Sequence, residues 1–421
     1  MNLQQKIAID RSLGYACAVA VNICARSIGI FLKRKRPLAG KYQVIVVSKL
    51  IGMGSVIQST PLLQTLRTQF PVAKLVYVTA SSNRELVERT GLIDVVSEID
   101  DTGYLSLISS YIRFVLTMLR LRVDWYIDLE VYSHLGGILA LSSLARMRTG
   151  FFRYSHNYRF GIYTDMVFFN ATAPISRVYL QMAGLGGASS MHSGLVAPRI
   201  SEEERNESCR QLKRIGLDMT MPYIVVNPNA SELRVERRWP VERYPLLFAE
   251  IKKRYPSLMI VLTGSAKEVP FVGSLMQTTG ANANVIDASG RLNLSDLIAL
   301  IDASTLMVTN DTGPMHLAFA LKKKTVSLWG PVSPRQYGED KRSYTIYKNA
   351  YCSPCTHDFL FPPCKGDNSC MKLIGVENVF EAVCAALEEK DTASAPPESE
   401  VIYNNIHGNE PLGIVHRNFF R

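Results

Sequence analysis

The sequence predicts an α/β protein with two Rossmann-like domains, each built on a doubly wound parallel sheet, and an N-terminal amphipathic helix. Two series of short, apolar, β-branched segments carry this prediction, because each series alternates with helical stretches. The charged, Pro-containing segment VAPRISEEER at 196–205 separates the series. A chain of 421 residues also suits two domains better than one core. We place the domains at 41–200 and 201–390.

The N-terminal segment, residues 1–40, is expected to associate with a membrane. Its apolar run LGYACAVAVNICA at 13–25 is followed by Arg26 and later by the basic cluster Lys33–Arg36. A spanning helix needs about 20 mainly apolar residues, and Arg26 falls in the middle of this window. Three interpretations are open. The helix packs on the body of the protein, or it lies in the cytoplasmic membrane interface with its basic cluster on acidic headgroups, or it spans the membrane.

The first domain is predicted from four buried strands with helical stretches between them. The helical stretches include TPLLQTLRTQF, SNRELVERTG and the amphipathic LSLISSYIRFVLTMLRLR. The predicted strands are 42–48, 73–79, 94–99 and 125–130.

The second domain repeats the pattern with five strands, at 223–228, 258–264, 284–289, 305–310 and 324–330. The polar segment 391–421, which contains two adjacent prolines, is expected to be a loose tail. Ligands of such sheets lie beyond the carboxyl ends of the strands, so functional residues are sought there.

Composition limits the choice of partners. The chain is 47% hydrophobic and 20% charged, as expected for packed cores, and its formal net charge is +10. This balance favours phosphates or acidic lipids, whereas nucleic acid is not expected because the basic residues are scattered without an aromatic-basic RNA motif. Eight cysteines do not make a disulfide scaffold in so long a chain, and no cleavable signal is evident. We therefore expect a cytoplasmic protein.

The segment TNDTGPMH at 309–316 offers an anion site in the second domain. Asp311, Thr312 and Gly313 form a turn from a strand into a helix that carries His316. A helix N-terminus presents unpaired N–H groups and a partial positive charge, which hold phosphate well. The alternative is that Asp311 or Thr312 only caps the helix.

Polar residues after two other strands extend this candidate site. Asn229, Ser231, Arg237 and Arg238 follow the first strand of the domain, and arginine suits diphosphate because it offers several fixed donors. The loop could also be a solvated basic surface. Glu268 follows the next strand as an acceptor for ribose hydroxyls or as a surface residue.

In the first domain, IGMGSVIQSTP at 51–61 forms a glycine turn into a helix. Gly54 and Ser55 begin this helix, and Ser55-x-x-Gln58 fits a capping box. A serine hydroxyl cannot act as a base without an activating partner. Glu130, at the end of a neighbouring strand, is therefore the candidate base, and Asp128 on the same face is expected to lie deeper.

Further residues of the first domain are candidates for an anionic acceptor. His134 begins the helix after Glu130, and RTGFFRYSHNYRFG at 148–161 adds Arg153, His156 and Arg159. A basic surface loop is the alternative for this segment.

The cluster CSPCTHDFLFPPCKGDNSC contains Cys352, Cys355, Cys364 and Cys370. Four thiolates would complete a tetrahedral structural zinc site. Reduced thiols without metal, or disulfides, are the alternatives.

Together these motifs resemble glycosyltransferase family 9, the heptosyltransferase-like enzymes, from about residue 42 to 388. The resemblance implies a GT-B fold, in which two parallel sheets face an interdomain cleft. It also implies inverting transfer of a heptose or related sugar from a nucleotide diphosphate to a lipid-linked saccharide, such as a lipopolysaccharide core. The first domain would bind the acceptor and the second the donor, with Thr312 and Gly313 on the diphosphate, Arg237 neutralising it and Glu268 on the ribose.

The chain departs from this family at Ser55, where the family has an aspartate that can act as the base. A subgroup that pairs a serine with an Asp-Leu-Glu strand end supports Glu130 as the replacement. No Asp-x-Asp pair stands at a strand end, so we expect metal-independent chemistry without a catalytic cofactor, at the inner face of the cytoplasmic membrane. A sugar-nucleotide epimerase of similar fold and a catalytically silent binding scaffold are the rival functions.

Overall fold

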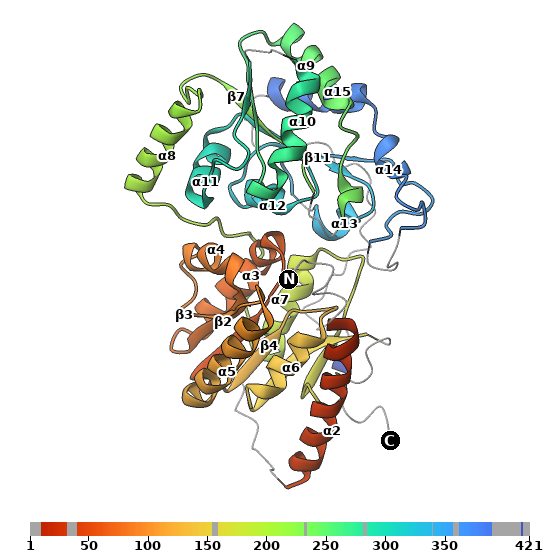
Figure 1. The fold of residues 1–421 in the computed structure, drawn as a ribbon. Helices are drawn as coiled ribbons and strands as arrows, with labels where there is room; N and C mark the ends of the chain where they lie inside the picture. The colour runs from red at the N-terminus through yellow and green to blue at the C-terminus, as the bar shows by residue number, and fades with distance from the viewer. Residues whose placement is uncertain are drawn as a thin grey trace. The chain divides into compact units, whose positions relative to one another are not determined.

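The computed structural model describes residues 10–31, 40–153, 159–230, 234–280, 284–338, 340–356, 362–389 and 414–415. The chain divides into two compact units, one of residues 1–196 with 405–421 and one of residues 197–404 (Figure 1).

The first unit contains a sheet in the order β13-β6-β5-β4-β1-β2-β3, parallel except for β13. Its strands are β1 Val44–Ser48, β2 Lys74–Ala80, β3 Val95–Ile99, β4 Trp125–Asp128, β5 Met147–Phe152, β6 Asp165–Phe168 and β13 Ile414–Val415. Ser48 and Asp128 are paired at the carboxyl ends of β1 and β4, so the turns after these strands lie side by side. The pair β13–β6 adds a strand where the sequence predicts only a loose tail.

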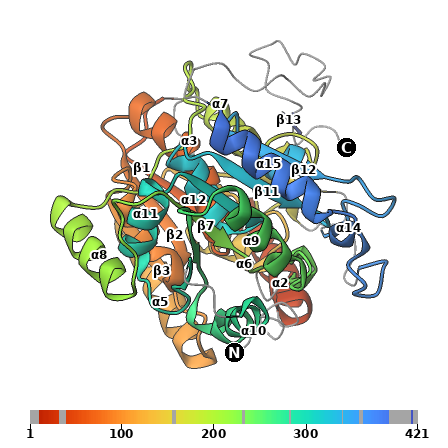
Figure 2. The same ribbon diagram turned by 90° about the horizontal axis from the view of Figure 1, so that it is seen from above.

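Helices cover both faces of this sheet. They are α2 Tyr15–Phe31, α3 Met53–Gln69, α4 Arg84–Arg89, α5 Tyr104–Leu121, α6 His134–Ser142 and α7 Ile175–Leu185. Helices α5, α6 and α2 share one apolar core with the sheet, and α6 lies between the other two (Figures 1 and 2). Helices α3 and α7 pack together over the opposite face.

The second unit contains an all-parallel sheet in the order β12-β11-β10-β7-β8-β9. Its strands are β7 Tyr223–Asn227, β8 Met259–Leu262, β9 Val285–Asp287, β10 Leu306–Asn310, β11 Thr325–Trp329 and β12 Ser343–Tyr347. Its helices are α8 Glu202–Arg214, α9 Arg243–Arg254, α10 Val269–Thr279, α11 Leu294–Ala303, α12 Gly313–Ala320, α13 Pro334–Tyr337, α14 Ser369–Lys372 and α15 Val376–Glu388. Helices α9, α10 and α15 build one core, and α11 contacts α8 and α12.

The structure confirms all nine predicted strands, with ends that differ by one or two residues. The predicted capping box of Ser55 is wrong. Helix α3 begins at Met53, and Gly52 is its N-cap with φ of 95°, a conformation that glycine adopts without strain. Ser55 is therefore the third residue of the helix. Helix α9, which follows the segment RRWP at 237–240, begins at Arg243.

The N-terminal helix α2 packs on the body of the first unit. Ala18 is fully buried, and the amide of Asn22 donates a hydrogen bond of 3.0 Å to the carbonyl of Phe160. Just before α2, the carboxylate of Asp10 accepts hydrogen bonds of 2.9 Å from the first backbone N–H groups of α6. The outer face of α2 exposes Ile23. The basic cluster 33–36 lies outside the described residues.

Candidate functional site

In the second unit, a network of polar side chains joins the carboxyl ends of β7 and β10. These strands are neighbours in register, with Asn227 opposite Thr309. The amide of Asn227 donates to the hydroxyl of Thr312 at 2.9 Å, and its carbonyl oxygen accepts from the amide of Asn229 at 2.9 Å. Thr312 is the N-cap residue of α12, but its side chain makes no capping bond. The first N–H groups of this helix are therefore left for another acceptor.

Asn310 fixes the loop that carries the predicted arginines. Its amide donates to the carbonyls of Pro228 and Asn229, and its oxygen accepts from the N–H of Trp239. The side chain is fully buried. Asn310 thus ties the loop after β7 to the start of α12, a role that sequence inspection missed.

A charged triad stands beside the start of α12. Arg237 Nη1 lies 3.2 Å from Asp311 Oδ2, and His316 Nε2 lies 3.9 Å from Asp311 Oδ1. Burial lowers the pKa of His316 to about 4; the nearby Asp311 raises it in part, and Arg237 lowers it further. The imidazole is therefore neutral near pH 7, and Arg237 supplies the positive charge of the triad.

Several buried polar atoms beyond β7, β8 and β9 have no hydrogen-bond partner among the described residues. They are Asn229 Oδ1, Arg237 Nε, Arg238 Nε, Thr263 Oγ1 and Ser289 Oγ. A buried polar group without a partner costs about 1–3 kcal/mol, so such groups rarely gather without a ligand. Donors and acceptors at three strand ends fit a polar, anionic molecule.

Gly264 brings part of this set together. A Cβ at this position would lie 2.9 Å from the amide nitrogen of Asn229 and 3.3 Å from the Cβ of Ser289. Any larger residue would therefore push apart the ends of β7 and β9. Thr263 and Ser289 carried no sequence signal beyond their position at the ends of predicted strands.

The remaining predicted donor residues have other local contacts. Arg238 lies 4.2 Å above the ring of Phe271, and Glu268 accepts from the N–H and hydroxyl of Ser265 at 2.7 and 2.9 Å. Glu268 therefore stabilises the turn after β8, as a surface residue would. Ser231 lies outside the described residues.

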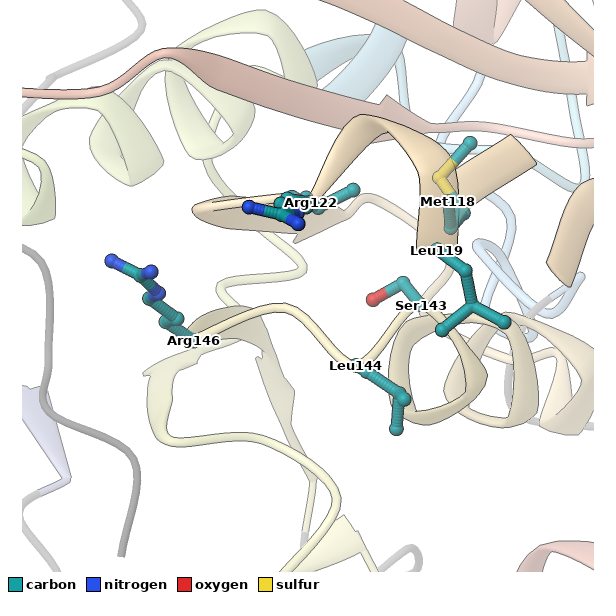
Figure 3. Close-up of a pocket in the computed structure, with 7 residues that line it drawn as sticks. Met118, Leu119, Arg122, Ser143, Leu144 and Arg146 are labelled. Atoms are coloured by element: carbon teal, nitrogen blue, oxygen red, sulfur yellow. The ribbon is translucent and has the colours of Figure 1, made fainter. Parts of the chain in front are cut away.

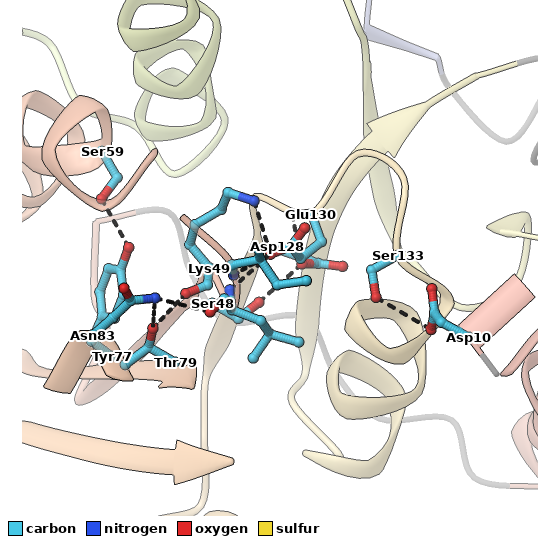
Figure 4. A network of polar contacts seen from close by, with 12 residues as sticks. Asp10, Ser48, Lys49, Ser59, Tyr77, Thr79, Asn83, Asp128, Glu130 and Ser133 are labelled. Carbon is cyan, nitrogen blue, oxygen red and sulfur yellow. Dashed lines mark hydrogen bonds and ion pairs between the residues drawn. The ribbon is translucent and has the colours of Figure 1, made fainter. Parts of the chain in front are cut away.

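In the first unit, the carboxylate of Glu130 holds the turn between β1 and α3 (Figure 4). Its Oε1 accepts from Lys49 Nζ at 2.9 Å and from the backbone N–H groups of Leu50 and Ile51 at 2.7 and 3.3 Å. Both charged side chains are buried, with 10% and 6% of the side chains of Lys49 and Glu130 exposed.

Asp128 lies deeper than Glu130, as the strand geometry predicts. It accepts from Ser48 Oγ at 3.0 Å, from Tyr163 at 2.5 Å and from the N–H of Glu130 at 3.0 Å. Burial raises its pKa above the ordinary value, partly offset by the charge of Arg159 and by the bond from Tyr163. Fully buried and bonded on both oxygens, Asp128 holds the strand end in place.

Ser55 acts on Tyr179 of α7. Burial raises the pKa of this phenol well above its ordinary value, the charge of Glu130 adds to the effect, and the side chain of Ser55 lowers the pKa in part. Gly54 is buried in the first turn of α3. Ser55 and Glu130 therefore act on the same tyrosine from two elements.

The predicted acceptor residues differ in accessibility. Arg159 is 1% exposed and donates to the carbonyls of Glu130, Phe151 and Ser133, so it holds loop ends together and offers no exposed charge. His134 is also buried, with its ring 5.5 Å from that of Tyr15.

Arg153 is the more accessible of the predicted acceptor arginines. It is half-buried and lies 4.6 Å above the ring of Tyr132. His156 lies outside the described residues.

The cysteine cluster consists of thiols in the structure. Cys352, Cys355, Cys364 and Cys370 are all free and influence one another electrostatically. Burial raises the pKa of Cys355, and that of Cys370 to about 11, which favours the neutral thiol. Within the described part of the chain, no three His, Cys, Asp or Glu residues are grouped to hold a metal ion.

Comparisons with known proteins show similarity to heptosyltransferases. The family model described as glycosyltransferase family 9 (heptosyltransferase) matches residues 189–360. Lipopolysaccharide heptosyltransferase 2 of Escherichia coli is 34% identical over 140 residues, which cover 32% of this chain and 38% of that protein. Lipopolysaccharide heptosyltransferase 3 of the same organism is 21% identical over 285 residues, covering 66% and 79%. The match to heptosyltransferase 2 thus covers little more than a third of that protein's length.

Solved structures show the same fold. A family 9 glycosyl transferase from Veillonella parvula has a TM-score of 0.69 at 23% identity, covering 84% of this chain and 99% of that one. E. coli ADP-heptose lps heptosyltransferase II has a TM-score of 0.64 at 21% identity, covering 82% and 98%. These likenesses confirm the predicted GT-B fold class.

Proposed function

We propose that this chain is a member of glycosyltransferase family 9 and that it transfers a heptose or related sugar, with inversion, from a nucleoside diphosphate to a lipid-linked saccharide, such as a lipopolysaccharide core. The main support is the set of partnerless buried polar atoms beyond β7, β8 and β9, next to the start of α12. That set has the chemistry of a nucleotide-diphosphate pocket. The named activity of the relatives supports the sugar and the acceptor class.

The diphosphate is assigned to the start of α12. The N–H groups after Thr312 and the guanidinium of Arg237 face the negative charge that grows on the leaving diphosphate. Asp311 holds Arg237 in place through its carboxylate. Fixed donors of this kind stabilise a leaving group without a metal ion, so we propose metal-independent transfer.

The acceptor hydroxyl is assigned to the first unit, with Glu130 as general base. The hydroxyl oxygen attacks the anomeric carbon and gives its proton to Glu130. The bond from the anomeric carbon to the diphosphate oxygen breaks, and its electron pair leaves with the diphosphate. Attack opposite the leaving group inverts the anomeric configuration. Because Oε1 already accepts three hydrogen bonds, we assign the proton to Oε2.

We propose that the protein works at the cytoplasmic face of the membrane, as a peripheral protein. A lipid-linked acceptor requires access to a bilayer surface. The basic charge of the chain and the exposed outer residues of α2 suit such a surface.

The donor site is tested by calorimetry with a panel of nucleotide sugars. Arg237→Ala and Gly313→Val should weaken binding of the best donor at least tenfold, since each removes a diphosphate contact or blocks its approach. Arg237→Lys should fall between, because it keeps the charge but not the fork of donors. Binding should persist in a chelator. Equal affinities in all variants, with circular dichroism unchanged, would place the site elsewhere.

A catalytically silent scaffold is the second candidate. The ion pair favours it, because Lys49 already engages the carboxylate of Glu130, the proposed base. A scaffold would bind nucleotide sugar but release no nucleoside diphosphate when acceptor is added. Turnover with any lipid-linked saccharide would exclude it.

A further inference from the structure

The outer face of helix α5 is apolar where a surface helix is usually polar. Its inner face packs on the sheet through Phe114 and Met118, both buried. Its outer face carries residues 48–83% exposed, which we call the α5 stripe: Leu105, Ile108, Ile112, Leu116 and Leu119. The spacing of three and four residues places them on one side of the helix.

Among the described residues, α5 is the one helix long and apolar enough to cross a membrane, yet it lies on a folded sheet with only 17% of its residues buried. Exposed apolar patches of this kind mark surfaces for another molecule or a membrane.

The charges around the stripe favour an anionic surface. Exposed Arg113 and Arg120 belong to α5, and Arg122 follows it, while the sequence of the helix contains no acidic residue. A second copy of the chain docked on this face would bring arginines together without acidic partners on the helix. Lipid phosphates supply those partners.

A pocket of about 640 Å³ lies at the end of α5 (Figure 3). Arg122 and Arg146 stand on one side of it, and Leu119 and Leu144 on the other. Arg146 is only loosely paired, at 3.8 Å from Asp124, so its guanidinium can still bind an anion. The pocket thus combines two guanidinium groups, which suit phosphate, with an apolar wall.

Two residues of the pocket hold unusual backbone conformations. Arg122 has φ of 54° and Leu144 has φ of 52°, in the left-handed region that glycine or asparagine adopts more easily. Leu144 is also 45% exposed.

We propose that the α5 stripe lies in the interface of a bilayer and that the Arg122–Arg146 pocket binds the phosphate of an anionic phospholipid. The purpose of this membrane-binding surface rests on the proposed function, because it would bring the protein to its lipid-linked acceptor. The surface is separate from the nucleotide site, which lies in the other unit.

The stripe is tested with the full chain and sedimenting vesicles of phosphatidylcholine, with and without phosphatidylglycerol. Ile108→Glu with Ile112→Glu should weaken binding to mixed vesicles about tenfold or more, because apolar area no longer enters the interface. Val72→Glu with Leu246→Glu is the matched control, since both residues are exposed apolar residues elsewhere. Equal loss in the control, or none in the stripe variant, would overturn the proposal.

The pocket is tested on the same vesicles. Arg122→Asn with Arg146→Gln should weaken binding to phosphatidylglycerol vesicles roughly 30-fold, about fivefold per arginine, and leave binding to phosphatidylcholine unchanged. Arg210→Gln with Arg214→Gln on α8 makes the same charge change on other exposed residues and should have little effect. If the pocket variant loses binding of soluble glycerol phosphate but still binds the vesicles, the pocket is a site for small anions and its assignment to a phospholipid is refuted.

Two readouts separate this proposal from its rivals. Light scattering that shows a dimer broken by the stripe variant, without vesicle binding in the native chain, would identify the stripe as a contact between copies. Calorimetry with the nucleotide sugar should be unchanged in every α5 variant. Vesicle binding by a chain that binds no nucleotide sugar would refute the proposed function and leave the membrane surface standing.

Discussion

Variants of the Lys49–Glu130 pair can separate the catalytic role of Glu130 from its contribution to the stability of the fold. In Glu130→Gln, the amide oxygen can still accept from the N–H groups of Leu50 and Ile51, but the ammonium of Lys49 is left buried without a counter-charge. Breaking a buried pair from one side costs about 3–5 kcal/mol. For a unit of about 200 residues, Tm should fall by roughly 6–20 °C. Lys49→Met should cost a similar amount.

The double variant Lys49→Met with Glu130→Gln removes both charges. Replacing a whole buried pair is often nearly neutral, so Tm should recover most of the loss. Transfer should not recover with it, because a general base contributes about 10²–10⁴-fold. Lys49→Met alone keeps the base and should stay within about tenfold of the native rate, measured well below its Tm.

The assay follows the release of nucleoside diphosphate from the donor found by calorimetry, with circular dichroism as the check of folding. Native-like transfer by the double variant would refute Glu130 as the base. Equal loss of transfer in Lys49→Met and Glu130→Gln, both folded, would show that the pair serves only to hold the turn after β1.

Three further predictions follow from other parts of the chain. Burial lowers the pKa of His316 from 6.5 to about 4. Between these pH values the imidazole is therefore protonated in the unfolded chain and neutral in the folded chain. The stability that the neutral His316 contributes is intact above pH 6.5 and is lost as pH falls to 4. Between these pH values, the free energy of unfolding measured in urea should therefore fall about 3 kcal/mol less for His316→Gln than for the native chain. Equal pH dependence of the two free energies would contradict this. If the four clustered cysteines bind structural zinc, metal analysis should give about one zinc per chain and a chelator should lower Tm, whereas metal-free protein of equal Tm supports free thiols. Replacing Lys33–Arg36 by serine should release full-length protein from membrane fractions, as high salt should, and retention after both would point to another anchor.

The sequence predicted the parts of the site that follow one another along the chain. The turn through Asp311 and Gly313 was found because a strand, a polar turn and a helix stand in series. Lys49 was not found, because it looks like the end of an apolar strand until pairing of β1 with β4 brings it to Glu130, 81 residues later. Asp10 was missed for the same reason, as it meets α6 across 124 residues.

Local rules also failed where a tertiary contact overrode them. The segment 148–161 was interpreted as acceptor-binding or as a basic surface loop, yet it contains most of strand β5. A Cβ on Gly150 of this strand would lie 2.5 Å from the ring of Tyr163, so the strand needs glycine. The capping box at Ser55 failed because Gly52 begins the helix earlier in a conformation that only its φ of 95° reveals. Sequence patterns thus located the site and its strands but not the contacts that order it.

The serine at position 55 and the carboxylate at position 130 are best understood as one arrangement. The side chain of Ser55 lowers in part the pKa of Tyr179, a buried phenol whose pKa the charge of Glu130 raises. An aspartate at position 55, as in the family that the turn resembles, would place a second negative charge on the same tyrosine and near the first. Like charges in a buried site disfavour each other's ionisation, so one of the two would be forced toward its neutral form. With serine there, Glu130 is the carboxylate paired with Lys49, and Asp128 lies deeper on the same strand end. The loss of an acid at one strand end and its presence at the next are therefore consistent with a base that has moved rather than disappeared.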